Sequence, residues 1–204
     1  MQLSGPLKGL MMRLPEIDRG DRLSSRLLFK LGSVLARTRF PDAARVAFYH
    51  RDFAGPELNA WTQHAMRGPS EWSVSERELM AAMVAQWNSC PFCVGAHRAV
   101  AVHGIAPETI QATLDDYRSA AISEVLRAAL TFIEKMTRDP GSLHVDDARA
   151  AIAGGVSRSQ LSDAAAVAAV FNIITRYANA LDFEIPGPDD FAKSSKTLLK
   201  RGYA

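Results

Sequence analysis

Apolar residues recur at the spacing of an α-helix through most of this chain, and no other sequence feature constrains the fold as strongly. Between residues 23 and 35, for example, six large apolar residues fall on one helical stripe. Runs that alternate apolar and polar residues are hard to find, and no Asn-Gly or Asp-Gly hairpin pair occurs. The sequence therefore predicts an all-α fold.

Capping signals divide this pattern into separate helices. Ser73 and Glu76 form a Ser-x-x-Glu capping box, and Ser157 forms a second one with Gln160. Pro91 suits the first position of a helix, where its missing N–H would have no partner anyway. With these signals we expect helices over residues 21–39, 42–53, 56–66, 73–88, 91–103, 107–117, 122–137, 145–153 and 157–183. The sequence 186–188, Pro-Gly-Pro, is expected to end the ordered pattern.

The pair Gly68-Pro69 is a soft boundary. It divides the chain into an N-terminal helical extension over residues 1–69 and a core over residues 70–186, followed by a C-terminal tail over residues 187–204. We expect the Lys-rich part of this tail after Phe191 to be loosely held. The formal net charge of +2 gives no footprint for nucleic acid. The most apolar stretch, residues 164–175, is shorter than the roughly 20 residues of a bilayer span. We expect a cytoplasmic protein that binds neither nucleic acid nor membrane.

Both cysteines of the chain lie in one motif. Cys90, Cys93 and His97 are spaced i, i+3, i+7, so they share one face of the helix that Pro91 begins. Glu78 lies on the preceding helix, and a short connection between the two helices predicts an antiparallel hairpin. The hairpin would bring two thiols, an imidazole and a carboxylate together.

Thiol chemistry needs these residue types. The thiolate is the nucleophile, and the positive end of a helix dipole favours it most strongly at Cys90. His97 can take the proton of Cys93 one turn away, and Glu78 can relay a proton or orient His97. A second thiol within reach closes a disulfide once the first is oxidised to sulfenic acid. The constellation therefore predicts a redox site.

Other interpretations of the same residues remain open. Two cysteines, a histidine and a carboxylate are also four ligands that zinc accepts, although structural zinc sites usually draw ligands from loops. The chain could instead be a metal-bound or non-catalytic oligomeric binding protein, or a disulfide oxidoreductase with another substrate. A thioredoxin-like site is disfavoured because no strand–helix–strand pattern surrounds the motif.

The string Glu78-x11-Cys90-x2-Cys93-x3-His97 resembles the active site of the alkyl hydroperoxide reductase D-like (AhpD-like) family of the carboxymuconolactone decarboxylase superfamily. The resemblance covers roughly residues 72–183 and implies an all-α, homo-oligomeric thiol peroxidase (a dimer, trimer or hexamer) without a cofactor or bound metal. It implies that Cys93 attacks the peroxide, that Cys90 donates a proton and resolves, and that Glu78 and His97 form the proton relay. An external dithiol, such as a lipoyl protein or a thioredoxin-like protein, would supply electrons. Phe92 stands where the best-known member has a histidine.

Two further polar groups carry expectations. Asn172, Arg176 and Asn179 fall at i, i+4, i+7 on an otherwise apolar helix, and we expect them to form a structural network. The charged faces that contain Arg67, Arg77 and Arg127 are expected to be solvated.

Overall fold

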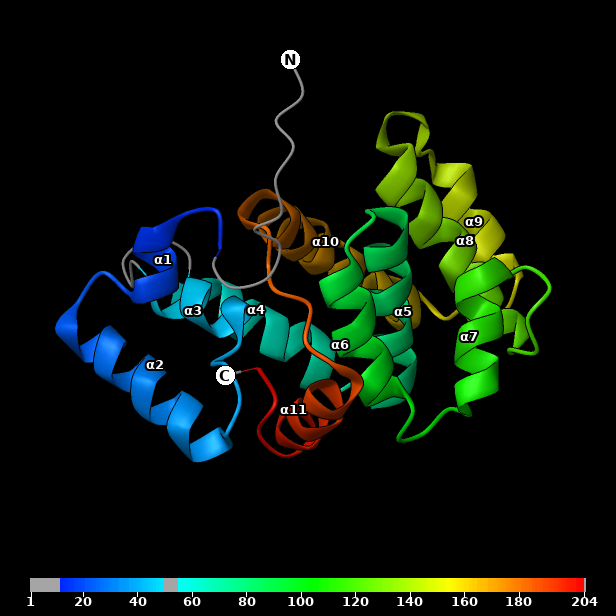
Figure 1. Cartoon of the computed structure of the whole chain (residues 1–204). Helices are drawn as coiled ribbons and strands as arrows, with labels where there is room; N and C mark the ends of the chain where they lie inside the picture. The colour runs from blue at the N-terminus through cyan, green and yellow to red at the C-terminus, as the bar shows by residue number, and fades with distance from the viewer. Residues whose placement is uncertain (1–11, 50–54, 204) are drawn as a thin grey trace, which may run out of the picture.

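The chain forms a bundle of helices, seen in a computed structural model that describes residues 12–49 and 55–203 (Figure 1). These described residues contain no strand, so the all-α prediction is confirmed. The elements are α1 (Pro15–Arg19), α2 (Leu23–Ala36), α3 (Asp42–Phe48), α4 (Gly55–Arg67), α5 (Val74–Trp87), α6 (Pro91–Ala101), α7 (Pro107–Asp116), α8 (Glu124–Arg138), the 3-10 helix η1 (Pro140–Ser142), α9 (Val145–Ala153), α10 (Arg158–Leu181) and α11 (Pro188–Arg201).

The capping signals place the helix starts correctly. Ser73 accepts a hydrogen bond from the Glu76 N–H and Glu76 accepts one from the Ser73 N–H, and Ser157 and Gln160 do the same at the start of α10. Each of the nine predicted helices corresponds to an observed one, with ends that differ by a few residues. The helix predicted to reach Phe53 is described only as far as Phe48, because residues 50–54 lie outside the described ranges.

Helix α5 lies at the centre of the bundle. It packs against α4, α6, α7, α8 and α10, and its residues 79–85 are almost completely buried. A helix enclosed on all sides needs no polar face, which explains the continuous apolar run from Leu79 to Ala85. Helix α10 is long and apolar enough to cross a membrane by length and composition alone. Its packing against α4, α5 and α8 instead makes it a core helix.

The segment after residue 187 is a helix, so the expectation of a loosely held tail is wrong. Pro188 occupies the first turn of α11 together with Asp189 and Asp190, and basic residues occupy the last turn, which suits the helix dipole. Helix α11 packs closely on α6. A Cβ atom added at Gly95 would lie 2.5 Å from the Phe191 ring, so only glycine permits this approach.

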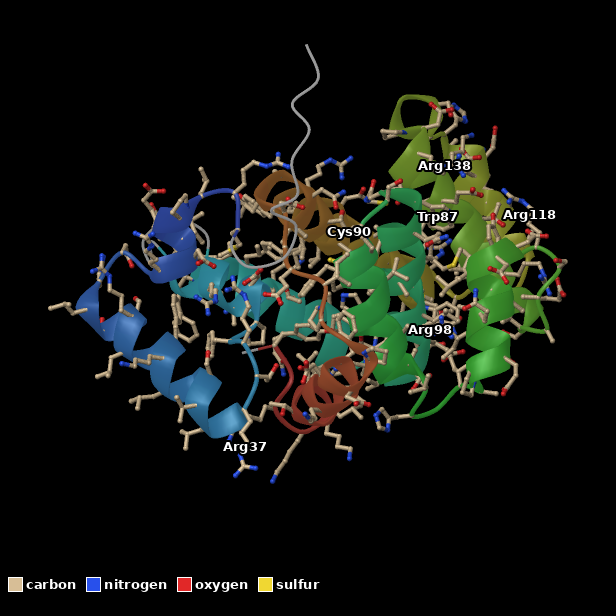
Figure 2. All side chains as sticks on the ribbon, viewed as in Figure 1. Arg37, Trp87, Cys90, Arg98, Arg118 and Arg138 are labelled. Carbon is tan, nitrogen blue, oxygen red and sulfur yellow. The ribbon has the colours of Figure 1, made fainter. Side chains whose placement is uncertain are left out.

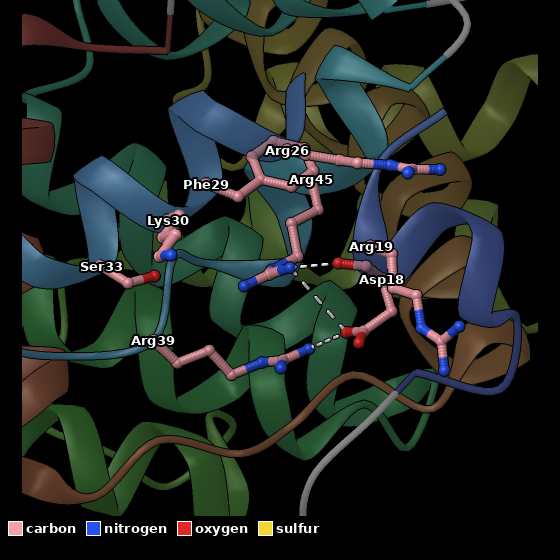
Figure 3. Close-up of a pocket in the computed structure, with 8 residues that line it drawn as sticks. All are labelled: Asp18, Arg19, Arg26, Phe29, Lys30, Ser33, Arg39 and Arg45. Atoms are coloured by element: carbon pink, nitrogen blue, oxygen red, sulfur yellow. Dashed lines mark hydrogen bonds and ion pairs between the residues drawn. The ribbon is translucent and has the colours of Figure 1, made fainter. Parts of the chain in front are cut away.

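Ion pairs join α1 to α3 and to Arg39 of the α2–α3 connection. Asp18 lies between Arg39 and Arg45 at the edge of a hollow of about 500 Å³ (Figure 3). Arg39 also contacts Asp42 at 2.7 Å and Glu184 at 2.9 Å, so carboxylates neutralise the inner guanidinium groups. Because Glu184 lies between α10 and α11, these ion pairs fasten the N-terminal helices to the core.

The apolar stripe of α2 is not buried within the chain. The exposed fraction reaches 82% for Leu23 and 84% for Leu35, and the other large apolar residues of the stripe are also exposed: Leu27, Leu28, Leu31 and Val34. Among the large apolar side chains described for this helix, Phe29 alone is buried, and it stacks on Phe40. The periodicity thus predicted the helix correctly but not the face that the chain buries.

Candidate active site

Cys90 and Cys93 lie at the start of α6, beside α5, and Figure 2 labels Cys90 there. Three residues, 88–90, connect the helices, and Ser89 takes a left-handed conformation with a φ of 53° that reverses the chain. Cys90 is the N-cap residue of α6, and Pro91 occupies the first turn. This connection is therefore what puts Cys90 at the positive end of the helix dipole.

A polar network on α10 holds the connection in place. The Asn88 side-chain amide donates to Asn172 Oδ1 and to Thr175 Oγ1, both at 3.0 Å, and the Asn179 amide donates to the Asn88 carbonyl at 2.8 Å. Arg176 in turn donates to Asn172 Oδ1 at 2.9 Å. The structural network expected at these positions is present, and its role is to position the turn that carries Cys90.

The two cysteines form no disulfide, are buried and differ in acidity. Each cysteine is 1% exposed. The pKa of Cys90 is lowered to about 7, mainly because the Cys93 S–H stabilises the Cys90 thiolate. The backbone N–H groups of Cys93 and Phe92 lower the pKa further, although Cys90 forms no side-chain capping hydrogen bond. The pKa of Cys93 is raised well above its ordinary value by its hydrogen bond to Cys90, by burial and by the Cys90 charge. The pair therefore loses its first proton at Cys90.

Residues distant in the sequence cover the thiols. Both cysteines belong to an apolar cluster with Met12, Ile17 and Phe183, against which the partly buried Tyr49 packs. Phe92 also packs against this cluster, and its ring meets Phe183 edge to face at 5.2 Å between centroids. Part of the N-terminal extension thus lies over the site. Because little thiol surface is exposed, a bulky substrate can reach the sulfur atoms only if this cover moves.

Glu78 and His97 form a second pair beside the thiols. His97 Nδ1 lies 2.7 Å from Glu78 Oε2, and both residues are buried, with exposed fractions of 0% for Glu78 and 4% for His97. Arg67 Nη2 contacts Glu78 Oε1 at 2.8 Å. Burial raises the pKa of Glu78, but hydrogen bonds and charge from His97 and Arg67 outweigh it and leave that pKa below the ordinary value. An ionised Glu78 accepts the Nδ1 proton, so Nε2 becomes the basic atom of the imidazole.

The four predicted residues therefore fall into two pairs. Cys90 interacts with Cys93, and Glu78 interacts with His97, but among the described residues no hydrogen bond links a thiol to His97 or Glu78. Neighbouring positions i and i+4 on α6 still place the Cys93 and His97 side chains side by side. Nor do residues 12–49 and 55–203 contain any cluster of three or more His, Cys, Asp or Glu side chains arranged to hold a metal ion.

Two residues of this site were not found from the sequence. Arg67 was expected to be solvated, yet its side chain is only 10% exposed, because it pairs with Glu78; Arg77 is also buried, where it donates to the carbonyls of Ala65 and Gly68. Tyr203 contacts both Glu78 and His97 from beyond α11. The helix signals of residues 188–201 could have shown that this segment folds back, but nothing in the sequence pairs Arg67 with Glu78.

Comparison with known proteins identifies a matching family model and several solved structures with a similar fold. Residues 56–135 match the model of the carboxymuconolactone decarboxylase family, while no curated protein matches the chain. The structure is similar to an uncharacterized peroxidase-related protein from Silicibacter sp. TM1040, with a TM-score of 0.72 and 23% identity over 93% of this chain and 98% of that chain.

Two other solved structures share the fold. An uncharacterized peroxidase-related protein with an alkylhydroperoxidase AhpD core, from Ralstonia eutropha JMP134, has a TM-score of 0.70 and 23% identity over 90% of this chain and 95% of that chain. The debrominase Bmp8, in complex with 2,3,4-tribromopyrrole, has a TM-score of 0.67 and 15% identity over 94% of this chain and 100% of that chain. At these identities the likeness shows the fold.

Proposed function

We propose that this chain is a dithiol peroxidase, on the premise that residues 56–135 match the carboxymuconolactone decarboxylase family model and that the chain has the AhpD-like helical fold. One observation carries the proposal: adjacent free thiols at Cys90 and Cys93, the pKa of Cys90 being lowered to about 7, beside a buried Glu78–His97 pair. Such a pair is partly ionised at neutral pH and has its own resolving thiol. A debrominase shares the fold, so a second substrate class has to be tested besides peroxides.

The proposed reaction begins at Cys90. Its thiolate attacks the terminal oxygen of a hydroperoxide, the O–O bond breaks, and Cys90 becomes a sulfenic acid. The leaving alkoxide takes the proton of the Cys93 S–H, which lies beside it. The Cys93 thiolate then attacks the Cys90 sulfur and expels hydroxide, and a disulfide forms. The two thiols thus supply the two electrons that reduce the peroxide to an alcohol and water.

His97 carries the remaining proton. Its Nε2 accepts the proton that the thiol pair loses on ionisation and returns it to the hydroxide that is expelled. Since no hydrogen bond among the described residues spans the gap from the thiols, this transfer requires rotation of a thiol or one bridging water molecule. Glu78, held ionised by Arg67, acts here as the group that orients His97 rather than as a proton carrier.

This order exchanges the roles that the family resemblance implies for the cysteines. The resemblance assigns attack to Cys93, but Cys93 is the less acidic thiol because its proton stabilises Cys90. Mass spectrometry after one equivalent of hydrogen peroxide or an organic hydroperoxide tests the order. We expect a Cys90–Cys93 disulfide in the wild type, a sulfenic acid on Cys90 in Cys93→Ser, and little oxidation of Cys90→Ser. If Cys90→Ser instead forms a sulfenic acid on Cys93 as fast as the wild type is oxidised, Cys93 is the attacking residue, as the family resemblance implies.

A second substrate class uses the same electrons. A dithiol can remove bromine from an aromatic carbon: one thiolate takes the bromine, the carbon takes a proton, and the second thiol expels bromide as the disulfide forms. The aromatic residues Phe92, Phe183 and Phe191 near the thiols favour a flat substrate, and a debrominase shares the fold. If the protein releases bromide from a brominated pyrrole but forms no disulfide with peroxide, debromination rather than peroxide reduction is its activity.

We also propose that the chain acts as a homo-oligomer in the cytoplasm, with an external lipoyl or thioredoxin-like dithiol as reductant. The exposed apolar stripe of α2 supports an oligomer, because monomers rarely leave such a surface uncovered. Light scattering should give a multiple of the 22.2 kDa chain mass. Replacement of Leu27 and Leu31 by Asp should shift the mass to that of one chain if α2 forms the interface. A wild-type mass near that of one chain would contradict the proposal.

A further inference from the structure

Tyr203 reaches the buried Glu78–His97 pair from the far end of the chain. Its hydroxyl donates to Glu78 Oε1 at 3.0 Å and approaches Oε2 at 3.2 Å, and it lies 3.4 Å from His97 Nδ1. Part of the residue surface is exposed, but the hydroxyl end is enclosed. A hydroxyl in contact with both Glu78 and His97 affects the orientation of each side chain.

The backbone fixes this position firmly. Gly202, with a φ of 72°, ends α11 and turns the chain inward, and the Tyr203 N–H then donates to Gln63 Oε1 at 2.6 Å. The ring lies between two site residues: the Arg67 guanidinium is 5.0 Å from its centroid, and the His97 ring is 6.4 Å away at an interplanar angle of 27°. Tyr203 is therefore built into the site.

The hydrogen bonds of Glu78 are then fully specified. Oε1 accepts from Arg67 and Tyr203, whereas Oε2 faces His97 Nδ1. Burial raises the pKa of Tyr203 well above its ordinary value, and the charge of Glu78 adds to this, so the hydroxyl remains a donor at neutral pH. With Arg67 and Tyr203 on one side, the carboxylate cannot rotate without losing two donors.

We propose that Tyr203 is a positioning residue of the proposed thiol chemistry: it fixes the orientation of Glu78 and, through Glu78, the tautomer of His97 that leaves Nε2 free. The inference rests on the proposed function only for its effect on rate. The orientation and the tautomer are properties of the resting protein. Tyr203 does not touch the thiols and acts only through Glu78 and His97.

Tyr203→Phe tests the inference, because it keeps the ring between Arg67 and His97 and removes only the hydroxyl. The first readout is the tautomer of His97, measured by nitrogen-15 NMR of its imidazole. We expect a single Nδ1–H tautomer in the wild type and a mixture in Tyr203→Phe. The second readout is the pH profile of thiol oxidation, whose acid limb should move upward by about one pH unit, so that the rate below that limb falls about tenfold.

Tyr117→Phe is the matched control. The Tyr117 hydroxyl also donates to a carboxylate, that of Glu134 at 2.7 Å, but it lies in the core between α7 and α8. We expect this variant to leave both the tautomer and the pH profile as in the wild type. If Tyr203→Phe keeps the wild-type tautomer and acid limb, the inference is overturned, even if its rate falls equally at every pH.

The two proposals fail separately. A wild-type protein that no peroxide oxidises refutes the peroxidase function, while the imidazole spectra of the wild type and Tyr203→Phe still decide the role of Tyr203. Conversely, rapid disulfide formation with identical spectra in both proteins supports the peroxidase and refutes the positioning role.

Discussion

Replacement of Glu78 by glutamine perturbs the most buried charge of the site. The Arg67 guanidinium needs an oxygen at the Oε1 position, so the amide nitrogen of the introduced glutamine would turn toward His97. There it would donate to Nδ1 and force the proton of His97 onto Nε2. The variant thus keeps the shape of the side chain but reverses the tautomer and removes the counter-charge of Arg67.

Two magnitudes follow from this geometry. Glu78 is 0% exposed and the Arg67 side chain is 10% exposed, so the substitution breaks a buried ion pair and should cost about 3 kcal/mol of unfolding free energy. The wrong tautomer removes the basic Nε2, and loss of general acid–base catalysis lowers rates by about 10²- to 10⁴-fold. Disulfide formation should therefore slow by a factor in that range while the thiols themselves remain.

Urea unfolding measures the first effect and stopped-flow thiol oxidation the second. Glu124→Gln is the control, because Glu124 also pairs with an arginine, Arg127 at 3.3 Å, but its side chain is 80% exposed. An exposed pair contributes about 0–1 kcal/mol, so this variant should resemble the wild type.

The dependence on pH gives a separate check. The pKa of Glu78 is lowered in the folded state, so its contribution to stability is present above the ordinary carboxyl pKa and is lost as the pH falls through the lower folded value. The wild type should therefore lose its advantage over Glu78→Gln below about pH 4. Equal stabilities of the two proteins at pH 7 would refute the argument that Glu78 is the ionised partner of Arg67.

Three other outcomes are expected. Iodoacetamide should modify the wild-type thiols with a midpoint near pH 7, since that is the lowered pKa of Cys90; a midpoint near the ordinary thiol value would contradict the acidity of the pair. Met12→Asp should speed thiol modification at least about tenfold, because Met12 is 2% exposed in the cover and a carboxylate there is expelled. Val145→Asp, at a site 51% exposed and outside both the cover and the α2 stripe, should not. Asn179→Ala should cost about 1 kcal/mol by urea unfolding, because it removes the hydrogen bond to the Asn88 carbonyl; an unchanged midpoint would show that the turn holds without it.

The parts of the structure that local sequence encodes were predictable. Ser73 and Glu76 define the start of α5 within four residues, and Pro91 defines the start of α6 in the same way. The spacing of Cys90, Cys93 and His97 on one helix follows from helical geometry alone. The all-α fold and the position of the thiols at a helix start were therefore correct, because each depends on contacts within a few residues.

The parts that were missed depend on contacts between distant segments. Arg67 resembles a surface residue in the sequence because nothing near it indicates the carboxylate that it meets. The α2 stripe shows the converse error, because periodicity reveals an apolar face without saying what covers it. Tyr203 lies 125 positions from Glu78, and no local pattern links them. The sequence of residues 188–201 does carry helix signals, but the preceding Pro-Gly-Pro predicted the end of ordered structure instead.

The two ends of the chain act on different parts of the site. From the N-terminal side, Met12 and Tyr49 cover the thiols, and from the C-terminal side, Tyr203 contacts the carboxylate and the imidazole. In the proposed reaction, the α5–α6 pair thus supplies the reactive groups, while segments remote from it lie where they would govern access and proton transfer. Substitutions in the N-terminal cover should therefore change thiol accessibility without altering the His97 tautomer. Substitutions after α11 should do the reverse, and a variant that changed both together would mean that the two regions are coupled through α6.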